Sequence, residues 1–114
     1  MTAPHDPPSA AELVEAVREF LETDVMEATD GRVRFHARVA ARVLAMVERE
    51  LDLGADQAEA HRERLAALGY PDDAALAASI RAGEVDDRLG EVTEAVRASV
   101  RDKLLVANPA YLEE

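Results

Sequence analysis

The sequence predicts an all-α fold, a compact bundle of about five helices in which three long amphipathic helices form the core. Apolar residues recur every three or four positions along most of the chain, and no segment alternates apolar and polar residues as a strand does. Alanine accounts for 23 of the 114 residues and only four residues are aromatic, so much of the buried surface should be methyl groups. Small side chains let helices approach closely, which favours a bundle over a thick sandwich core.

The first predicted helix runs from about residue 10 to residue 27. Ser9 and Glu12 have the spacing of a capping box, in which each side chain bonds the backbone of the other residue. At 100° per residue, one arc of this helix is apolar and the opposite side is acidic. The apolar arc holds Leu13, Val14, Val17, Phe20, Leu21 and Val25, and the acidic side holds Glu12, Glu15, Glu19 and Glu22. Asp30 and Gly31 then give a turn.

The second predicted helix, about 32–52, has an apolar arc that covers roughly half its circumference. Its central stripe is Phe35, Val39, Val43, Met46 and Val47. A helix with so wide an apolar arc is usually central, and Gly54 is expected to end it.

Three further helices are expected. A polar helix spans about 56–68 and ends at Gly69, and a short alanine-rich helix spans about 73–82 and ends at Gly83. The last helix, about 86–107, carries a stripe of Leu89, Val92, Val96, Val100 and Leu104. Asn108 before Pro109 ends it, because proline disfavours helix in the preceding residue. Residues 9–109 should form a single domain, between a disordered segment at 1–8 and a tail at 110–114.

The net charge of −11 argues against binding to nucleic acid or to an anionic membrane, because phosphate groups repel an acidic surface. Cysteine is absent, which excludes disulfides, thiol nucleophiles and cysteine metal sites. The first residues have no basic and apolar segments of a secretory signal, and no apolar run approaches the ~20 residues of a membrane span. We therefore expect a cytoplasmic protein.

His36 is the single residue of most interest, because it lies within the apolar arc of the second helix beside Phe35. A buried neutral imidazole usually bonds a carbonyl or a carboxylate, and this structural interpretation is the simpler one. The alternative is that His36 acts as a base or contacts a ligand.

Four arginines, Arg34, Arg38, Arg42 and Arg49, lie along one flank of the same helix. They could pair with the glutamates of a neighbouring helix. Alternatively, they dock an acidic partner or bind a phosphate or carboxylate through the guanidinium fork. We therefore take His36, Arg34, Arg38 and Arg42 as candidate contacts to a partner or ligand.

No catalytic residue, cofactor or metal ligand is assigned. Glu59, His61 and Glu63 look like a ligand set, but residues two apart on a helix point about 200° apart and cannot share a metal. No phosphate-binding loop, nucleophile elbow or zinc motif occurs. Whether the chain is an enzyme stays open, with a non-enzyme favoured.

Four segments together resemble a family of small bacterial proteins of unknown function. They are Pro8–Leu21, Gly31–Ala41, Ile80–Glu84 and Lys103–Tyr111, and the block from Phe35 to Ala40 is the more specific part. Members of this family are typically encoded beside a phosphotransferase resembling aminoglycoside kinases and beside an acyl-CoA dehydrogenase. The resemblance implies a partner or accessory subunit of a kinase-like enzyme, and it draws attention to His36, Arg38 and Asn108.

The favoured hypothesis is therefore a non-catalytic accessory or regulatory module that binds a phosphotransferase-like kinase. Two alternatives stay open: a helical module that binds a small molecule or an acyl chain, and a structural homo-oligomer whose thin core is completed by another copy.

Overall fold

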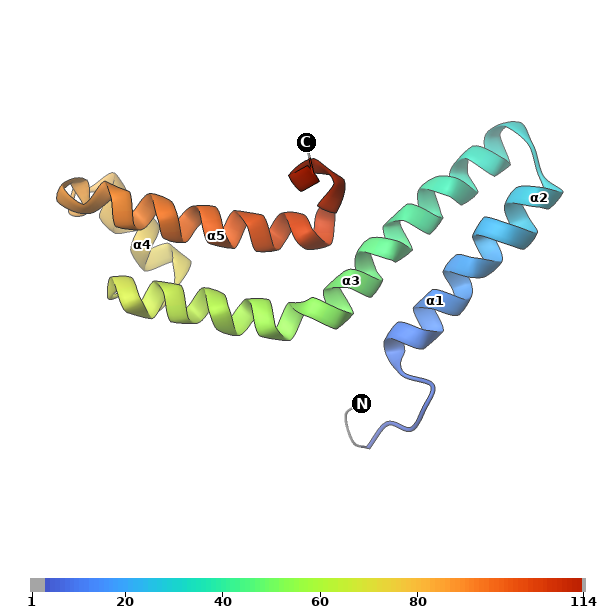
Figure 1. Cartoon of the computed structure of the whole chain (residues 1–114), viewed down its shortest axis with the longest axis horizontal. Helices are drawn as coiled ribbons and strands as arrows, with labels where there is room; N and C mark the ends of the chain where they lie inside the picture. Colours follow the sequence, from blue (N-terminus) through green and yellow to red (C-terminus); the bar gives the residue numbers. More distant parts are fainter. Residues whose placement is uncertain (1–3, 114) are drawn as a thin grey trace. The chain divides into compact units, whose positions relative to one another are not determined.

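Residues 4–113 are described by a computed structural model, and every regular element among them is helical (Figure 1). This confirms the predicted all-α class. The helices are α1 (Ala10–Phe20), α2 (Met26–Ala28), α3 (Gly31–Leu68), α4 (Asp73–Arg81) and α5 (Leu89–Ala107). A π-helical segment, Leu21–Val25, joins α1 to α2 without a break, and short 3-10 helices lie at Asp86–Arg88 and Pro109–Glu113.

The predicted count of five helices is too high for residues 4–113. The labels α1 and α2 belong to one continuous helix, 10–28, and the segments predicted at 32–52 and 56–68 also form one helix, α3. Gly54 does not end it, and it is not among the described glycines with positive φ. A glycine inside a helix costs only about 1 kcal/mol relative to alanine, and good helix formers such as Ala55, Gln57 and Ala58 follow it. Gly54 instead coincides with the division of the chain into two compact units, residues up to 53 and residues from 54 onward.

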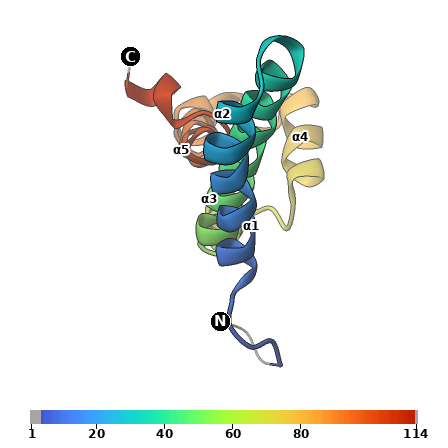
Figure 2. The same ribbon diagram turned by 90° about the vertical axis from the view of Figure 1, so that its right-hand side faces the viewer.

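The first unit is an antiparallel helical hairpin. Figures 1 and 2 both show α1 running alongside the first half of α3. The predicted capping box is present, with Ser9 and Glu12 bonded in both directions. Two hydrogen bonds with Ser9 lower the pKa of the Glu12 carboxyl. The bond from the Ser9 backbone N–H has the larger effect, and the bond with the Ser9 side chain has the smaller one. Of the described residues of this unit, only Ala37 and Ala41 are buried.

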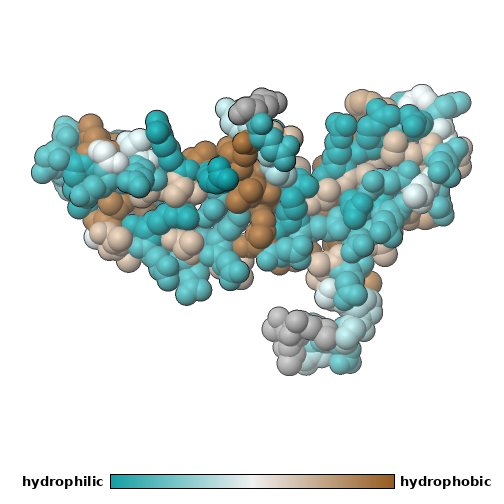
Figure 3. All heavy atoms as spheres, in the orientation of Figure 1, coloured by the Kyte–Doolittle hydropathy of each residue, from teal (hydrophilic) through white to brown (hydrophobic). Residues whose placement is uncertain are grey.

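The second unit contains the main buried cluster, formed by the end of α3, α4 and α5. Leu65, Leu68, Leu76, Val85 and Val92 make up this cluster, with Tyr70 and Ala95 packed against it. This differs from the predicted core of three long helices, since no residue of helix 10–28 is buried. Leu89, Val96 and Val100 of the predicted α5 stripe are also exposed. In Figure 3, hydrophobic side chains reach the surface towards the C-terminal end of α5.

The helix ends in this unit follow the predicted signals. At Gly69, the amide of Gly69 bonds the carbonyl of Ala66 and the amide of Tyr70 bonds the carbonyl of Leu65, both at 2.9 Å. This pair of bonds is a Schellman motif, and it requires the left-handed conformation that Gly69 adopts with φ of +97°. The N-terminus of α4 is capped by Asp72, whose Oδ1 accepts from the amide of Ala75 at 2.8 Å.

The conformation of Gly69 predicts the effect of a small substitution. Gly69→Ala should lower the free energy of unfolding by about 1 to 2 kcal/mol, because an L-residue is strained in the left-handed region. A Cβ at this position meets no atom within 4 Å, so the cost is conformational rather than steric. Gly90→Ala is the matched control, since Gly90 lies inside α5 and also has open space around its Cβ. Urea unfolding should show Gly90→Ala at least as stable as the wild type. Equal stability of the Gly69 variant would contradict this assignment.

Candidate functional site

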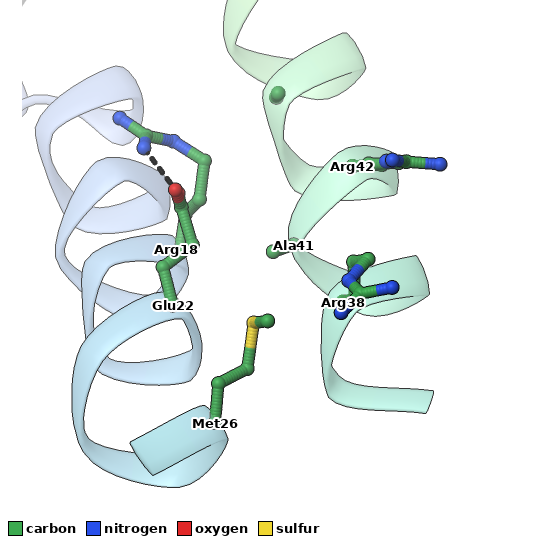
Figure 4. Close-up of a pocket in the computed structure, with 7 residues that line it drawn as sticks. Arg18, Glu22, Met26, Arg38, Ala41 and Arg42 are labelled. Atoms are coloured by element: carbon green, nitrogen blue, oxygen red, sulfur yellow. Dashed lines mark hydrogen bonds and ion pairs between the residues drawn. The ribbon is translucent and has the colours of Figure 1, made fainter. Parts of the chain in front are cut away.

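The groove on one face of the hairpin holds two of the four candidate residues. It has a volume of about 350 Å³ and lies between helix 10–28 and α3 (Figure 4). Its lining consists of Arg18, Glu22, Met26, Arg38, Ala41, Arg42 and Ala45. Figure 4 shows Arg38 and Arg42 one turn apart on α3, and Ala41 on the side of α3 that faces α1.

Arg18 forms an ionic link between the two helices of the hairpin. Its Nε donates to Glu48 of α3, its Nη2 donates to the other carboxylate oxygen of Glu48 at 3.3 Å, and its Nη1 bonds Glu22 one turn along. Both the Arg18 and the Glu48 side chains are half-buried. The bond to Glu48, and then the bond to Glu22, raise the pKa of Arg18. The sequence analysis missed this residue, although an arginine within the apolar arc of the first helix is the signal that could have identified it.

Arg38 and Arg42 form no ion pair and no side-chain hydrogen bond with any residue from 4 to 113. Pairing with glutamates of the neighbouring helix is therefore wrong for these two residues. Glu22, which lines the groove, and Glu48 of α3 are bound to Arg18 instead. Within residues 4–113, the two guanidinium groups therefore have no carboxylate partner.

Arg34 has a local structural contact. Its Nε donates to the backbone carbonyl of Met26 at 3.2 Å, across the turn that joins α2 to α3. This bond satisfies one of the carbonyls left open at the end of a helix. The structure therefore separates Arg34 from the pair of arginines in the groove.

His36 is exposed, so the expectation of a buried imidazole is wrong for the isolated chain. Its ring packs edge to face against Phe35, with centroids 5.5 Å apart. The physical reason is that the apolar arc of α3 is only partly covered by α1. His36 directly precedes the buried Ala37 whereas Arg38 follows it, so the histidine and the arginine lie on opposite flanks of α3.

The second unit contains a polar cluster that the sequence analysis did not identify. His61 of α3 contacts Ser99 of α5 through Nδ1 at 2.7 Å, and Asp73 of α4 through Nε2 at 2.8 Å. Arg64 donates to the same Ser99 oxygen at 3.0 Å and to Asp102 at 3.0 Å. His61 with Arg64, and Ser99 with Asp102, are each three residues apart on one helix face, which is the signal that could have paired them.

This cluster fits a structural role. Ser99, His61 and Asp73 are the residue types of a nucleophilic triad. Here, however, the Ser99 oxygen also accepts a hydrogen bond from Arg64, and Arg64 is held by Asp102 of the same helix as Ser99. The contacts join α3, α4 and α5 around the buried cluster. Within residues 4–113, no group of three or more His, Cys, Asp or Glu side chains is arranged to hold a metal ion. The helices of the same range include none that is both long and apolar enough to cross a bilayer.

Ser99→Ala should lower the free energy of unfolding by about 1 kcal/mol or more, because His61 and Arg64 each lose a partner in a half-buried site. Thr93→Ala is the control, since Thr93 is an exposed hydroxyl residue on the same helix. Urea unfolding monitored by circular dichroism measures both. A loss no greater than that of Thr93→Ala would show that the cluster does not stabilise the unit.

Comparisons with known proteins place the chain in a family. No curated protein matches it, and no solved structure does. A family model described as a domain of unknown function, DUF6285, matches residues 27–111, which include α3, α4, α5 and both arginines of the groove. The match covers well over half of the chain, and the protein therefore belongs to the DUF6285 family, a family of unknown function.

Proposed function

We propose that the protein is a non-catalytic accessory or regulatory subunit of a phosphotransferase-like enzyme, and that Arg38 and Arg42 contact an acidic segment of that enzyme. The observation that carries the proposal is the pair of unpartnered guanidinium groups beside the groove. The chain has a net charge of −11, yet these two neighbouring arginines have no carboxylate partner in the described structure. An acidic partner outside the chain would supply one.

The geometry of the pair suits a carboxylate-rich partner. Residues four apart on a helix have their Cβ atoms about 5 to 6 Å apart, so Arg38 and Arg42 can each bind a carboxylate of one partner segment. Charge-assisted bonds from the planar guanidinium fork are directional and about twice as strong as neutral hydrogen bonds. Charged side chains at a rim of this kind also guide association through long-range attraction.

The inner wall of the groove does not oppose an acidic partner. Glu22, the acidic residue of the lining, is already bonded to Arg18. Arg18 is held in place by Glu48, so the wall is ordered before a partner arrives. Such preorganisation lowers the entropy lost on binding.

The identity of the partner rests on the family resemblance described above. Family membership supplies no activity to transfer, and the resemblance implies a kinase-like neighbour acting on a small hydroxylated or acyl substrate. The absence of known catalytic motifs also supports an accessory role. The arginine pair then provides the surface for contact.

A small ligand bearing a phosphate or carboxylate is the second candidate occupant of the groove. The volume of about 350 Å³ lies within the range of ligand pockets. A thermal-shift series with acyl-CoA and phosphorylated hydroxy acids tests this alternative. A ligand at 100 times its dissociation constant adds about 2.7 kcal/mol of stability, so binding would raise the melting temperature measurably.

The double variant Arg38→Glu/Arg42→Glu should weaken binding to the phosphotransferase-like kinase encoded beside this protein at least tenfold, because two attractive contacts become repulsive. Isothermal titration calorimetry at two salt concentrations measures the affinity, and added salt should weaken the wild-type complex.

The control for charge is Arg62→Glu/Arg97→Glu. Arg62 and Arg97 are exposed residues of the second unit, and this variant makes the same change in net charge. It should bind like the wild type. Equal weakening in both double variants would show a non-specific charge effect, and no binding by the wild type would refute the accessory role.

A further inference from the structure

The two helices of the hairpin have the same pattern around their contact. Arg18 bonds Glu48 of α3, and Val14 and Leu21, four residues before it and three after it on helix 10–28, are half-buried; on α3 the buried residues are Ala37 and Ala41. Residues that directly follow these contact positions are charged on both helices. They are Glu15, Glu22, Arg38 and Arg42, and the last three line the groove described above.

Residues that directly precede the contact positions are apolar or aromatic on both helices. Because both helices are right-handed and run antiparallel, the preceding positions of both fall on one side of the hairpin and the following positions on the other. The hairpin therefore has a charged face that contains the groove and an opposite face that is apolar. The apolar residues of this face are Leu13, Val17, Phe20, Ala40, Val43 and Val47, and the polar ring of His36 lies among them.

The apolar face is uncovered in the single chain. Phe20 is 55% exposed, and Val43 is 51% exposed. The exposed apolar side chains of this face amount to an area on the order of 500 Å², which is the size of the largest apolar patches on monomeric proteins. Patches of this size often bind a partner. An interface of standard size buries about 800 Å² per partner, so polar residues at the rim would supply the remainder.

We propose that a second copy of the chain covers this face, so that two hairpins form an antiparallel four-helix bundle. A two-fold dimer uses the same patch on both copies, and the face is continuous along both helices, as such an interface requires. Two hairpins stacked face to face give the four-helix arrangement that buries amphipathic helices in soluble proteins.

Charge selects the arrangement of the two copies. Helix 10–28 carries six acidic residues and one arginine, whereas residues 31–53 carry five arginines and three acidic residues. Arg38 and Arg42 lie on the groove face, so the selection rests on the acidic residues of helix 10–28, and stacking this helix on α3 of the other copy keeps the two acidic helices apart. The alternative, with each helix stacked on its own counterpart, brings the two acidic helices together and is disfavoured.

The proposal is independent of kinase binding, because the interface and the groove lie on opposite faces of the hairpin. The Arg38→Glu/Arg42→Glu variant should therefore keep the mass of the dimer even where it loses the kinase. Failure of either proposal is thus distinguishable from failure of the other.

The first experiment measures the mass of the full chain by light scattering after gel filtration. The wild type should have twice the 12.4 kDa of one chain. Val43→Glu should be monomeric, with a shift of at least tenfold in the dimer dissociation constant, and it should keep its helical circular dichroism because Val43 is exposed in the single chain. Val100→Glu is the matched control, since Val100 is 48% exposed on α5 in the other unit, and it should remain dimeric.

Three results would overturn the proposal. These are a wild type that is monomeric up to millimolar concentration, a Val43→Glu variant that stays dimeric, and a Val100→Glu variant that is the only monomer. If Val43→Glu loses its helical signal, Leu13→Glu near the start of α1 provides the second test of the same face, and a dimeric Leu13→Glu variant would equally overturn it.

Disulfide trapping tests the arrangement, because the chain has no cysteine of its own. The Arg18–Glu48 ion pair places residues 17 and 47 at the same height on the apolar face. A mixture of Val17→Cys and Val47→Cys proteins should give the mixed disulfide on mild oxidation, and neither protein alone should give a disulfide efficiently. Predominant self-linking of Val17→Cys would show that like helices stack, and no cross-linking would contradict the bundle.

Discussion

The continuity of α3 is the constraint on which the rest of the structure depends. One helix supplies Ala37 and Ala41 to the hairpin and Leu65 and Leu68 to the buried cluster of the second unit. Neither unit could form its contacts without this helix. Gly54 in its middle is tolerated because the helix-forming residues on either side offset a cost of about 1 kcal/mol.

Local signals in the sequence predicted the helix ends well, because each depends on a few neighbouring residues. The capping box at Ser9, the Schellman glycine at Gly69 and the stop before Pro109 are all present. Gly54 was misread because glycine ends a helix only where the chain takes a left-handed conformation, and sequence does not reveal φ. The extent of burial was also beyond the sequence, since an apolar arc shows what a helix can bury and not what covers it. His36 illustrates this limit.

The candidate site shows the same division. The arginine flank was visible from spacing alone. Whether Arg38 and Arg42 pair within the chain depended on which residue forms ion pairs with the nearby glutamates. Arg18 forms these ion pairs, with Glu22 and Glu48. His61 bonds Asp73 and Ser99, which lie 12 and 38 residues further along the sequence on other helices. No pattern within one helix specifies such pairings.

The opposite placement of the two faces of the hairpin has a consequence for stoichiometry. If the apolar faces join two chains, the charged grooves remain on the outside of the bundle, one from each copy. The assembly is then bivalent, and a dimeric enzyme could engage both grooves at once. The second contact would form within the complex at an effective concentration in the millimolar range, so that two weak ionic contacts could hold an enzyme that neither holds alone.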